Sequence, residues 1–297
     1  MNILEEIKRF FLHGSVLARL IGINVAVFVL INLLGGIFYL MAKPEHYEAM
    51  AYALSVPAAT ELIAQKPWTV ITYMFLHMNF FHILFNMIVL YVGGRLFIDF
   101  LGKEKLIGTY LLGGIAGAIV YIVSFNIFPV FQDTLPVSIA MGASASVLAI
   151  FIAIAVYAPN LYIPLLLLGR VRLKYIALFF IIIDLISIHK GNPGGHLAHL
   201  GGAMWGFIYI SLLKAGLDPA KYVGKFINGI AGIFNRKPRM RVHYEKAAPR
   251  PVSDEEYNKH RVVEQEEIDK ILDKISKHGY DSLSTKEKEL LFKNSKR

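Results

Sequence analysis

Long apolar segments recur along this chain, and three of them carry strongly polar side chains. Hydrophobic residues make up 55% of the 297 residues, and the mean hydropathy is +0.50, which excludes an ordinary soluble globular protein. A membrane-spanning helix requires about 20 mostly apolar residues. The sequence therefore predicts an all-α, polytopic membrane protein with a six-helix bundle, whose spans are 17–40, 80–100, 106–125, 139–157, 173–188 and 197–213.

The predicted spans divide the chain into four parts. Residues 1–16 form the N-terminus and 17–214 the membrane domain. Residues 215–252 are expected to be a basic juxtamembrane linker. Residues 253–297 are expected to form an amphipathic helical tail, because a capping-box pattern begins at Ser253 and apolar residues follow on one helical stripe. A docking or regulatory tail and a simply solvated one both fit this pattern.

The distribution of Lys and Arg predicts the orientation of the spans, because cytoplasmic loops carry an excess of basic residues. Basic residues lie at the start of the first span, around the loop between the second and third spans, around the loop between the fourth and fifth, and after the sixth. These segments are expected on the cytoplasmic side, so both termini are expected in the cytoplasm. The residues concerned are Lys8, Arg9, Arg19, Arg95, Lys103, Lys105, Arg170, Arg172, Lys174 and Lys214.

The net charge is +9, and basic residues are most concentrated just after the membrane domain, where residues 221–250 contain eight Lys and Arg against one acid, Glu245. Their position directly after the last span favours a patch that contacts anionic lipid over a nucleic-acid surface. The expected partners are therefore the lipid bilayer and no nucleic acid.

This orientation places four polar side chains at one depth. The second, fourth and sixth spans run inwards, and they carry His82 and Asn86, Ser144, and His199 near their outer ends. At a rise of 1.5 Å per residue, all four lie within about 10 Å of those ends. Because polar groups in hydrocarbon are energetically unfavourable, their presence is a hypothesis of function by default.

The four residue types supply the groups that a serine hydrolase needs. We interpret Ser144 as the nucleophile and His199 as the general base, which later protonates the leaving amine. His82 and Asn86 are spaced i, i+4, so both can donate hydrogen bonds from one helix face to an oxyanion. The backbone N–H of Ser144 is a third donor if Gly142 lets the chain enter the helix with free amides.

No acid lies close to His199 in sequence, so the prediction is a Ser–His dyad. Asp184, near the outer end of the fifth span, is the one carboxylate that could contribute, and a polar anchor at the interface is the simpler interpretation. The pair Gly202 and Gly206, with Gly142, is expected to let the fourth and sixth helices approach closely.

Each signal alone has a structural explanation. A serine in a membrane helix usually bonds its own helix backbone, and Ser146 faces another side of the helix than Ser144. His77, His189 and His196 are expected near the outer surface, solvated or structural. The chain has no cysteine, and no metal site or cofactor is predicted.

Taken together, these motifs resemble the rhomboid family of intramembrane serine proteases. The resemblance covers about residues 68–213 and rests on three patterns: His77-x₄-His82-x₃-Asn86 with Gly93-Gly94, Gly142-x-Ser144, and Ala198-His199-x-x-Gly202-x-x-x-Gly206. It implies a six-helix fold around a water-filled cavity, with a Ser144–His199 dyad and an oxyanion hole of His82, Asn86 and the Ser144 amide. It also implies single-span membrane proteins as substrates and, from the tail, a bacterial inner membrane.

The chain departs from the family pattern at three positions, which bear on efficiency and specificity. Ala145 stands where the family usually has Gly, Leu148 where an aromatic often packs on the histidine, and Thr69 where Arg often follows Trp68. A non-catalytic rhomboid-like chaperone or quality-control protein is the alternative function. A small transporter is a third possibility, although the sequence has no convincing inverted repeat.

Overall fold

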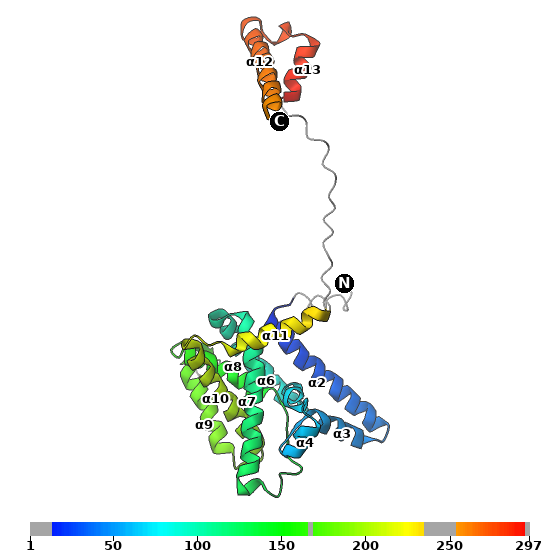
Figure 1. Ribbon diagram of the computed structural model, residues 1–297, viewed down its shortest axis with the longest axis vertical. Helices are drawn as coiled ribbons and strands as arrows, with labels where there is room; N and C mark the ends of the chain where they lie inside the picture. Colours follow the sequence, from blue (N-terminus) through cyan, green and yellow to red (C-terminus); the bar gives the residue numbers. More distant parts are fainter. Residues whose placement is uncertain (1–13, 166–168, 235–253, 295–297) are drawn as a thin grey trace. The chain divides into compact units, whose positions relative to one another are not determined.

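The computed structural model describes residues 14–165, 169–234 and 254–294 (Figure 1). The chain divides into two compact units, Met1–Arg236 and Lys237–Arg297. Helices dominate both units within the described residues. Each unit is described by itself below.

Four long helices form the frame of the first unit: α2 (Val16–Leu40), α6 (Phe80–Leu101), α7 (Leu106–Ile127) and α10 (Pro193–Lys214). Among the described residues, these four are long and apolar enough to cross a membrane. They confirm the all-α membrane class. The count of six spans stays a prediction, because α8 (Ser144–Tyr157) and α9 (Leu173–Ser187) have 14 and 15 residues.

Shorter elements connect these helices. They are α3 (Pro44–Leu54), β1 (Val56–Pro57), α4 (Thr60–Gln65), α5 (Thr69–Thr72), η1 (Tyr73–Phe75), η2 (Lys103–Lys105), η3 (Pro129–Phe131), β2 (Ile139–Ala140), β3 (Tyr162–Leu165) and β4 (Gly169–Arg172). Strand β1 pairs antiparallel with β2, and β3 pairs antiparallel with β4.

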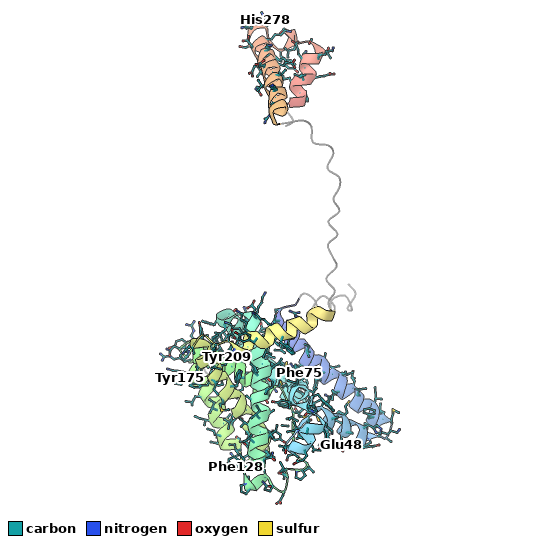
Figure 2. All side chains as sticks on the ribbon, viewed as in Figure 1. Glu48, Phe75, Phe128, Tyr175, Tyr209 and His278 are labelled. Atoms are coloured by element: carbon teal, nitrogen blue, oxygen red, sulfur yellow. The ribbon has the colours of Figure 1, made fainter. Side chains whose placement is uncertain are left out.

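Helix α10 packs against α7, α8 and α9, and α8 also packs against α6 and α7. Figure 1 shows α9 and α2 on opposite sides of this unit. Eleven of the fourteen residues of α8 are buried, so α8 is the core of the bundle. Figure 2 shows Phe128 at one end of the bundle, with Tyr175 and Tyr209 near the other.

The fourth predicted span is wrong at its start. Residues 139–140 form β2, and the helix begins only at Ser144, because Gly142 has a φ of +125° that no helix contains. Fourteen residues extend about 21 Å, less than the roughly 30 Å of a hydrocarbon core. Ala143, which directly precedes α8, is fully buried, so the N-terminus of α8 lies inside the bundle rather than at its surface.

The sixth predicted span also begins at a different residue. Helix α10 starts at Pro193, because Asn192 caps it by accepting a hydrogen bond from the Gly195 N–H at 3.0 Å. Proline is favourable in the first turn, where its missing N–H has no partner to lose. His199 is consequently the seventh residue of α10 and lies below the helix end.

Helix α11 (Pro219–Phe234) lies within the segment that the sequence analysis expected to be a linker. Asp218 starts it, since its Oδ1 accepts the Lys221 N–H at 3.1 Å and also the Tyr209 hydroxyl at 3.2 Å. The backbone of Ala220 packs so closely on Gly108 of α7 that a side chain at Gly108 would overlap it. The start of α11 is therefore fixed to the bundle.

The second unit consists of α12 (Asp254–His278), η4 (Tyr280–Ser282) and α13 (Thr285–Asn294). Gly279, with a φ of +77°, directly follows the last residue of α12. The residues expected on one apolar stripe of α12 are not equally buried. Ile271 is buried, whereas Leu272 is half exposed. Ser253, which was expected to cap α12, lies outside the described residues.

A capping box begins α13. The Ser284 N–H donates to Glu287 Oε2 at 2.7 Å, and the Glu287 N–H donates to Ser284 Oγ at 3.4 Å. Lys274 of α12 reaches the same carboxylate at 3.0 Å. The backbone hydrogen bond from Ser284, followed by that from Lys274, lowers the pKa of Glu287 to about 2. These contacts join the two helices of the unit.

Candidate active site

A cavity of about 360 Å³ opens in the first unit between α6, α8, α9 and α10. Most of its lining is apolar. Five polar side chains also line it: His82, Asn86, Ser144, Asp184 and His199. The structure thus brings all four residues that the sequence analysis placed at one depth onto one cavity. It adds the carboxylate of Asp184.

Helix α6 presents His82 and Asn86 from its first two turns. The Asn79 side chain caps the helix by accepting the N–H groups of Phe81 and His82 at 2.9 and 3.3 Å. This cap fixes the start of α6, so that the i, i+4 pair points into the cavity from one face.

Ser144 enters the cavity at the first turn of α8. The preceding loop is held in place by two hydrogen bonds, from the Gly142 N–H to the Tyr73 carbonyl at 2.8 Å and from the Ala143 N–H to His77 Nε2 at 3.2 Å. The first amides of a helix have no intrahelical acceptor, and they carry partial positive charge. The start of α8 therefore favours negative charge beside Ser144.

His77 is fully buried, with an exposed fraction of 0%, so the possibility of a solvated residue near the outer surface is wrong. Its Nε2 lies 3.2 Å from the Ala143 nitrogen and 3.3 Å from Asn86 Nδ2. His77 therefore joins the loop before Ser144 to the helix that carries Asn86. The sequence could not show this, because the contact with Ala143 spans 66 residues.

The two side chains predicted to donate to the oxyanion, Asn86 and His82, differ in the hydrogen bonds that they already make. Asn86 Nδ2 donates to the His82 carbonyl at 3.0 Å and lies beside His77, so both of its hydrogens have neighbours. Within the described part of the chain, the His82 imidazole makes no hydrogen bond, and it lies against Gly142. His82 is thus the donor that is available without rearrangement.

Gly142 is required by both its conformation and its surroundings. A Cβ atom there would lie 2.7 Å from His82 Cε1, and the φ of +125° is strained for any other residue. We expect Gly142→Ala to displace the Ser144 amide and the His82 ring together, at a strain of about 1–3 kcal/mol. The kcat should fall by about 100-fold, the usual effect of losing an oxyanion donor.

The matched control for this change is Gly216→Ala. Gly216 has a φ of +84°, and no atom lies within 4 Å of its Cβ position. It lies after the end of α10, away from the cavity, so the control tests backbone strain without the clash. Measured kcat and KM of the two variants should diverge, and equal kcat values would contradict the role given to Gly142.

Helices α8 and α10 meet backbone to backbone. A side chain at Gly202 would overlap the Ala145 carbonyl, and one at Gly206 would overlap the Ala149 carbonyl. Ala145, where the family usually has Gly, is accommodated because its Cβ faces Gly117 of α7. This close approach carries His199 of α10 to the same cavity as Ser144 of α8.

Ser144 and His199 are not joined by a hydrogen bond among the contacts of the described residues. Both line the cavity, and nucleophile–base hydrogen bonds are often looser before substrate binds. The competing Ser146 is fully buried, and its Oγ has no hydrogen-bond partner within the described residues. Ser146 does not line the cavity with His199.

Asp184 accepts hydrogen bonds from two histidines of α10. Its Oδ1 lies 2.8 Å from His199 Nδ1 and 2.8 Å from His196 Nδ1. Asp184 is 4% exposed, so it is no anchor at the interface. Asp184 was identified from the sequence, but its two histidine partners were not. The signal available was the short turn between α9 and α10, which brings residues near that turn together.

The same three groups could hold a metal ion, since their ligand atoms lie within 4.8 Å of one another. Two Nδ1–H groups that share one carboxylate oxygen account for the spacing without an ion. Unlike His196 and His199, His189 does not contact Asp184 in the described part of the chain. It is exposed and follows the end of α9.

Comparisons with known proteins cover both units. Residues 64–215 match the Rhomboid domain model, and residues 253–297 match the Family of unknown function (DUF6576). A curated relative is "Presenilin-associated rhomboid-like protein A, mitochondrial" of Danio rerio, which is 29% identical over 144 residues. That match covers 46% of this chain and 35% of the relative.

Proposed function

The chain belongs to the rhomboid family, and we propose that it is an intramembrane serine endopeptidase that cleaves membrane proteins in or near a transmembrane segment. The observation that carries this proposal is the cavity shared by Ser144, His199 and two hydrogen-bond donors. A non-catalytic member would not require these groups to converge.

In the proposed reaction, Ser144 Oγ attacks the substrate carbonyl carbon while His199 Nε2 takes the hydroxyl proton. The tetrahedral intermediate collapses as His199 gives that proton to the leaving amine, which breaks the peptide bond. A water molecule then attacks the acyl-enzyme by the same route and restores Ser144. The catalytic residues are therefore the dyad of Ser144 and His199.

The oxyanion is proposed to be stabilised by His82, Asn86 and the Ser144 N–H. The N-terminus of α8 contributes its unpaired amides and its dipole at this point. Asn86 would give up one of its present contacts, with the His82 carbonyl or with His77, to reach the oxyanion.

The proposed substrates are single-span membrane proteins. The cavity wall consists mostly of apolar side chains, among them Phe81 and Phe85 of α6 and Phe180 of α9. Such a wall suits an apolar peptide segment, and the few polar groups fix the position of its scissile bond.

The chain is a multi-pass membrane protein, and we propose that both termini are cytoplasmic, on the distribution of Lys and Arg. The exposed Lys221, Tyr222, Lys225 and Phe226 of α11 support contact with an anionic lipid surface. A bacterial inner membrane stays a prediction, and the relative described above is mitochondrial. The partner of the tail is not proposed.

Labelling with a fluorophosphonate probe tests the proposed nucleophile. We expect the purified wild-type protein in proteoliposomes to form an adduct that mass spectrometry locates on Ser144. Ser144→Ala should lose the adduct, while Ser146→Ala should keep it, because Ser146 lies outside the cavity. An adduct that persists in Ser144→Ala would reject Ser144 as the nucleophile, and a correctly inserted protein that forms none would favour the non-catalytic alternative.

A further inference from the structure

We propose that Asp184 is a positioning residue that completes a Ser144–His199–Asp184 arrangement, with His196 as a second donor that holds the carboxylate. The proposal rests on the proposed function, since it assigns a role relative to the general base His199. It replaces the expected dyad by three residues on three helices, α8, α9 and α10.

The contact with Asp184 fixes the tautomer of His199. A neutral imidazole carries a single N–H, on either Nδ1 or Nε2. The carboxylate of Asp184 accepts from Nδ1 at 2.8 Å, which requires the proton on Nδ1. The lone pair is then on Nε2, the atom that must take a proton from Ser144.

The negative charge of Asp184 also supports His199 during the reaction. His199 becomes an imidazolium when it takes the serine proton, and a carboxylate in contact with it stabilises that positive charge. Asp184 is 4% exposed, so little water screens the interaction. A carboxylate so buried needs partners of its own, and the two Nδ1–H groups supply them.

His196 holds the Asp184 carboxylate in place. His196 and His199 are spaced i, i+3 on α10, so they lie on one face towards α9. His196 Nδ1 is also 2.8 Å from Asp184 Oδ1, and it thus fixes the oxygen that His199 uses. Leu148 stands where the family often has an aromatic on the histidine, and Asp184 supplies the orientation that Leu148 cannot.

Steady-state cleavage of a single-span reporter in proteoliposomes is the first test. Asp184→Asn keeps the size of the side chain and removes its charge, so kcat should fall about 100-fold or more, with KM within about threefold of wild type. His196→Ala leaves the Asp184–His199 contact in place, so its loss should be about tenfold or less. Asp99→Asn, at an exposed position in the last turn of α6, is the matched control and should keep the wild-type kcat.

The second test reads the His199 tautomer directly by ¹⁵N NMR of the histidine rings, with His199→Gln to assign the signals. The wild type should show the proton on Nδ1. Asp184→Asn should show loss of that single tautomer, because an amide can present its NH₂ group to Nδ1. A purely structural role for Asp184 would change stability and leave the tautomer unaltered.

The outcomes separate this proposal from the proposed function. Asp184→Asn with kcat within about threefold of wild type, or an Nε2–H tautomer in the wild type, overturns the role of Asp184 while the dyad stands. Cleavage that survives in Ser144→Ala rejects the proposed function. If no reporter is cleaved, the NMR measurement still decides whether Asp184 fixes His199.

Discussion

Cleavage of a tagged single-span reporter is expected to fall by about 1000-fold or more in Ser144→Ala and in His199→Ala. Ser144→Ala removes the nucleophilic hydroxyl, and His199→Ala removes the base that activates it, so either change ends nucleophilic attack. The two losses should not add, so the double variant should be about as inactive as either single one. Reporter cleavage by purified protein in proteoliposomes measures all three.

Ser146→Ala is the matched control in this series. Ser146 lies two residues along the same helix, and among the described residues its Oγ has no hydrogen-bond partner to lose. The variant should therefore keep its activity within about twofold, the range expected for a change that removes no contact. Cleavage that persists in both Ser144→Ala and His199→Ala would contradict the assignment of the nucleophile and the base.

Gly202→Ala is expected to reduce both the stability and the activity of the protein. The new methyl group would overlap the Ala145 carbonyl, a backbone atom that cannot move aside without shifting α8. Overpacking of this kind typically lowers the free energy of unfolding by about 1–3 kcal/mol or more. Because Ser144 adjoins Ala145, the same shift moves the nucleophile relative to His199. Thermal unfolding in detergent and the reporter kcat measure the two effects.

Gly36→Ala is the control for Gly202→Ala. Gly36 lies in α2, and no atom lies within 4 Å of its Cβ position. Removing a glycine from a helix interior stabilises the helix by about 0.5–1 kcal/mol, so Tm should rise or stay unchanged. If Gly202→Ala also left Tm and kcat unchanged, the backbone contact between α8 and α10 would not govern the site.

Much of the membrane domain could be predicted because its signals are local. A continuous apolar run specifies a long helix whatever surrounds it, and the predicted starts of the spans at Leu17, Phe80 and Leu106 lie within one residue of the helix starts. The convergence of Ser144, His199, His82 and Asn86 followed from one assumption about orientation. The motifs that resemble the rhomboid family contain the same four residues.

The predictions that differ from the structure depend on long-range backbone contacts. A run that is apolar from Ile139 onwards does not reveal that residues 139–140 pair with β1, far earlier in the chain. Similarly, the basic composition of 215–252 did not reveal α11, whose start is held by Tyr209 and Gly108 of other helices.

The sequence by itself determined the family, the helical membrane class and the identities of the proposed catalytic residues, because residue type and spacing along one helix carry that information. Only the tertiary structure decided that Asp184 contacts His199 and that His77 is buried beside Ala143. Those contacts depend on the rotation of each helix about its axis and on how closely the glycines let helices pack. Neither quantity is encoded in the spacing of residues within a single segment.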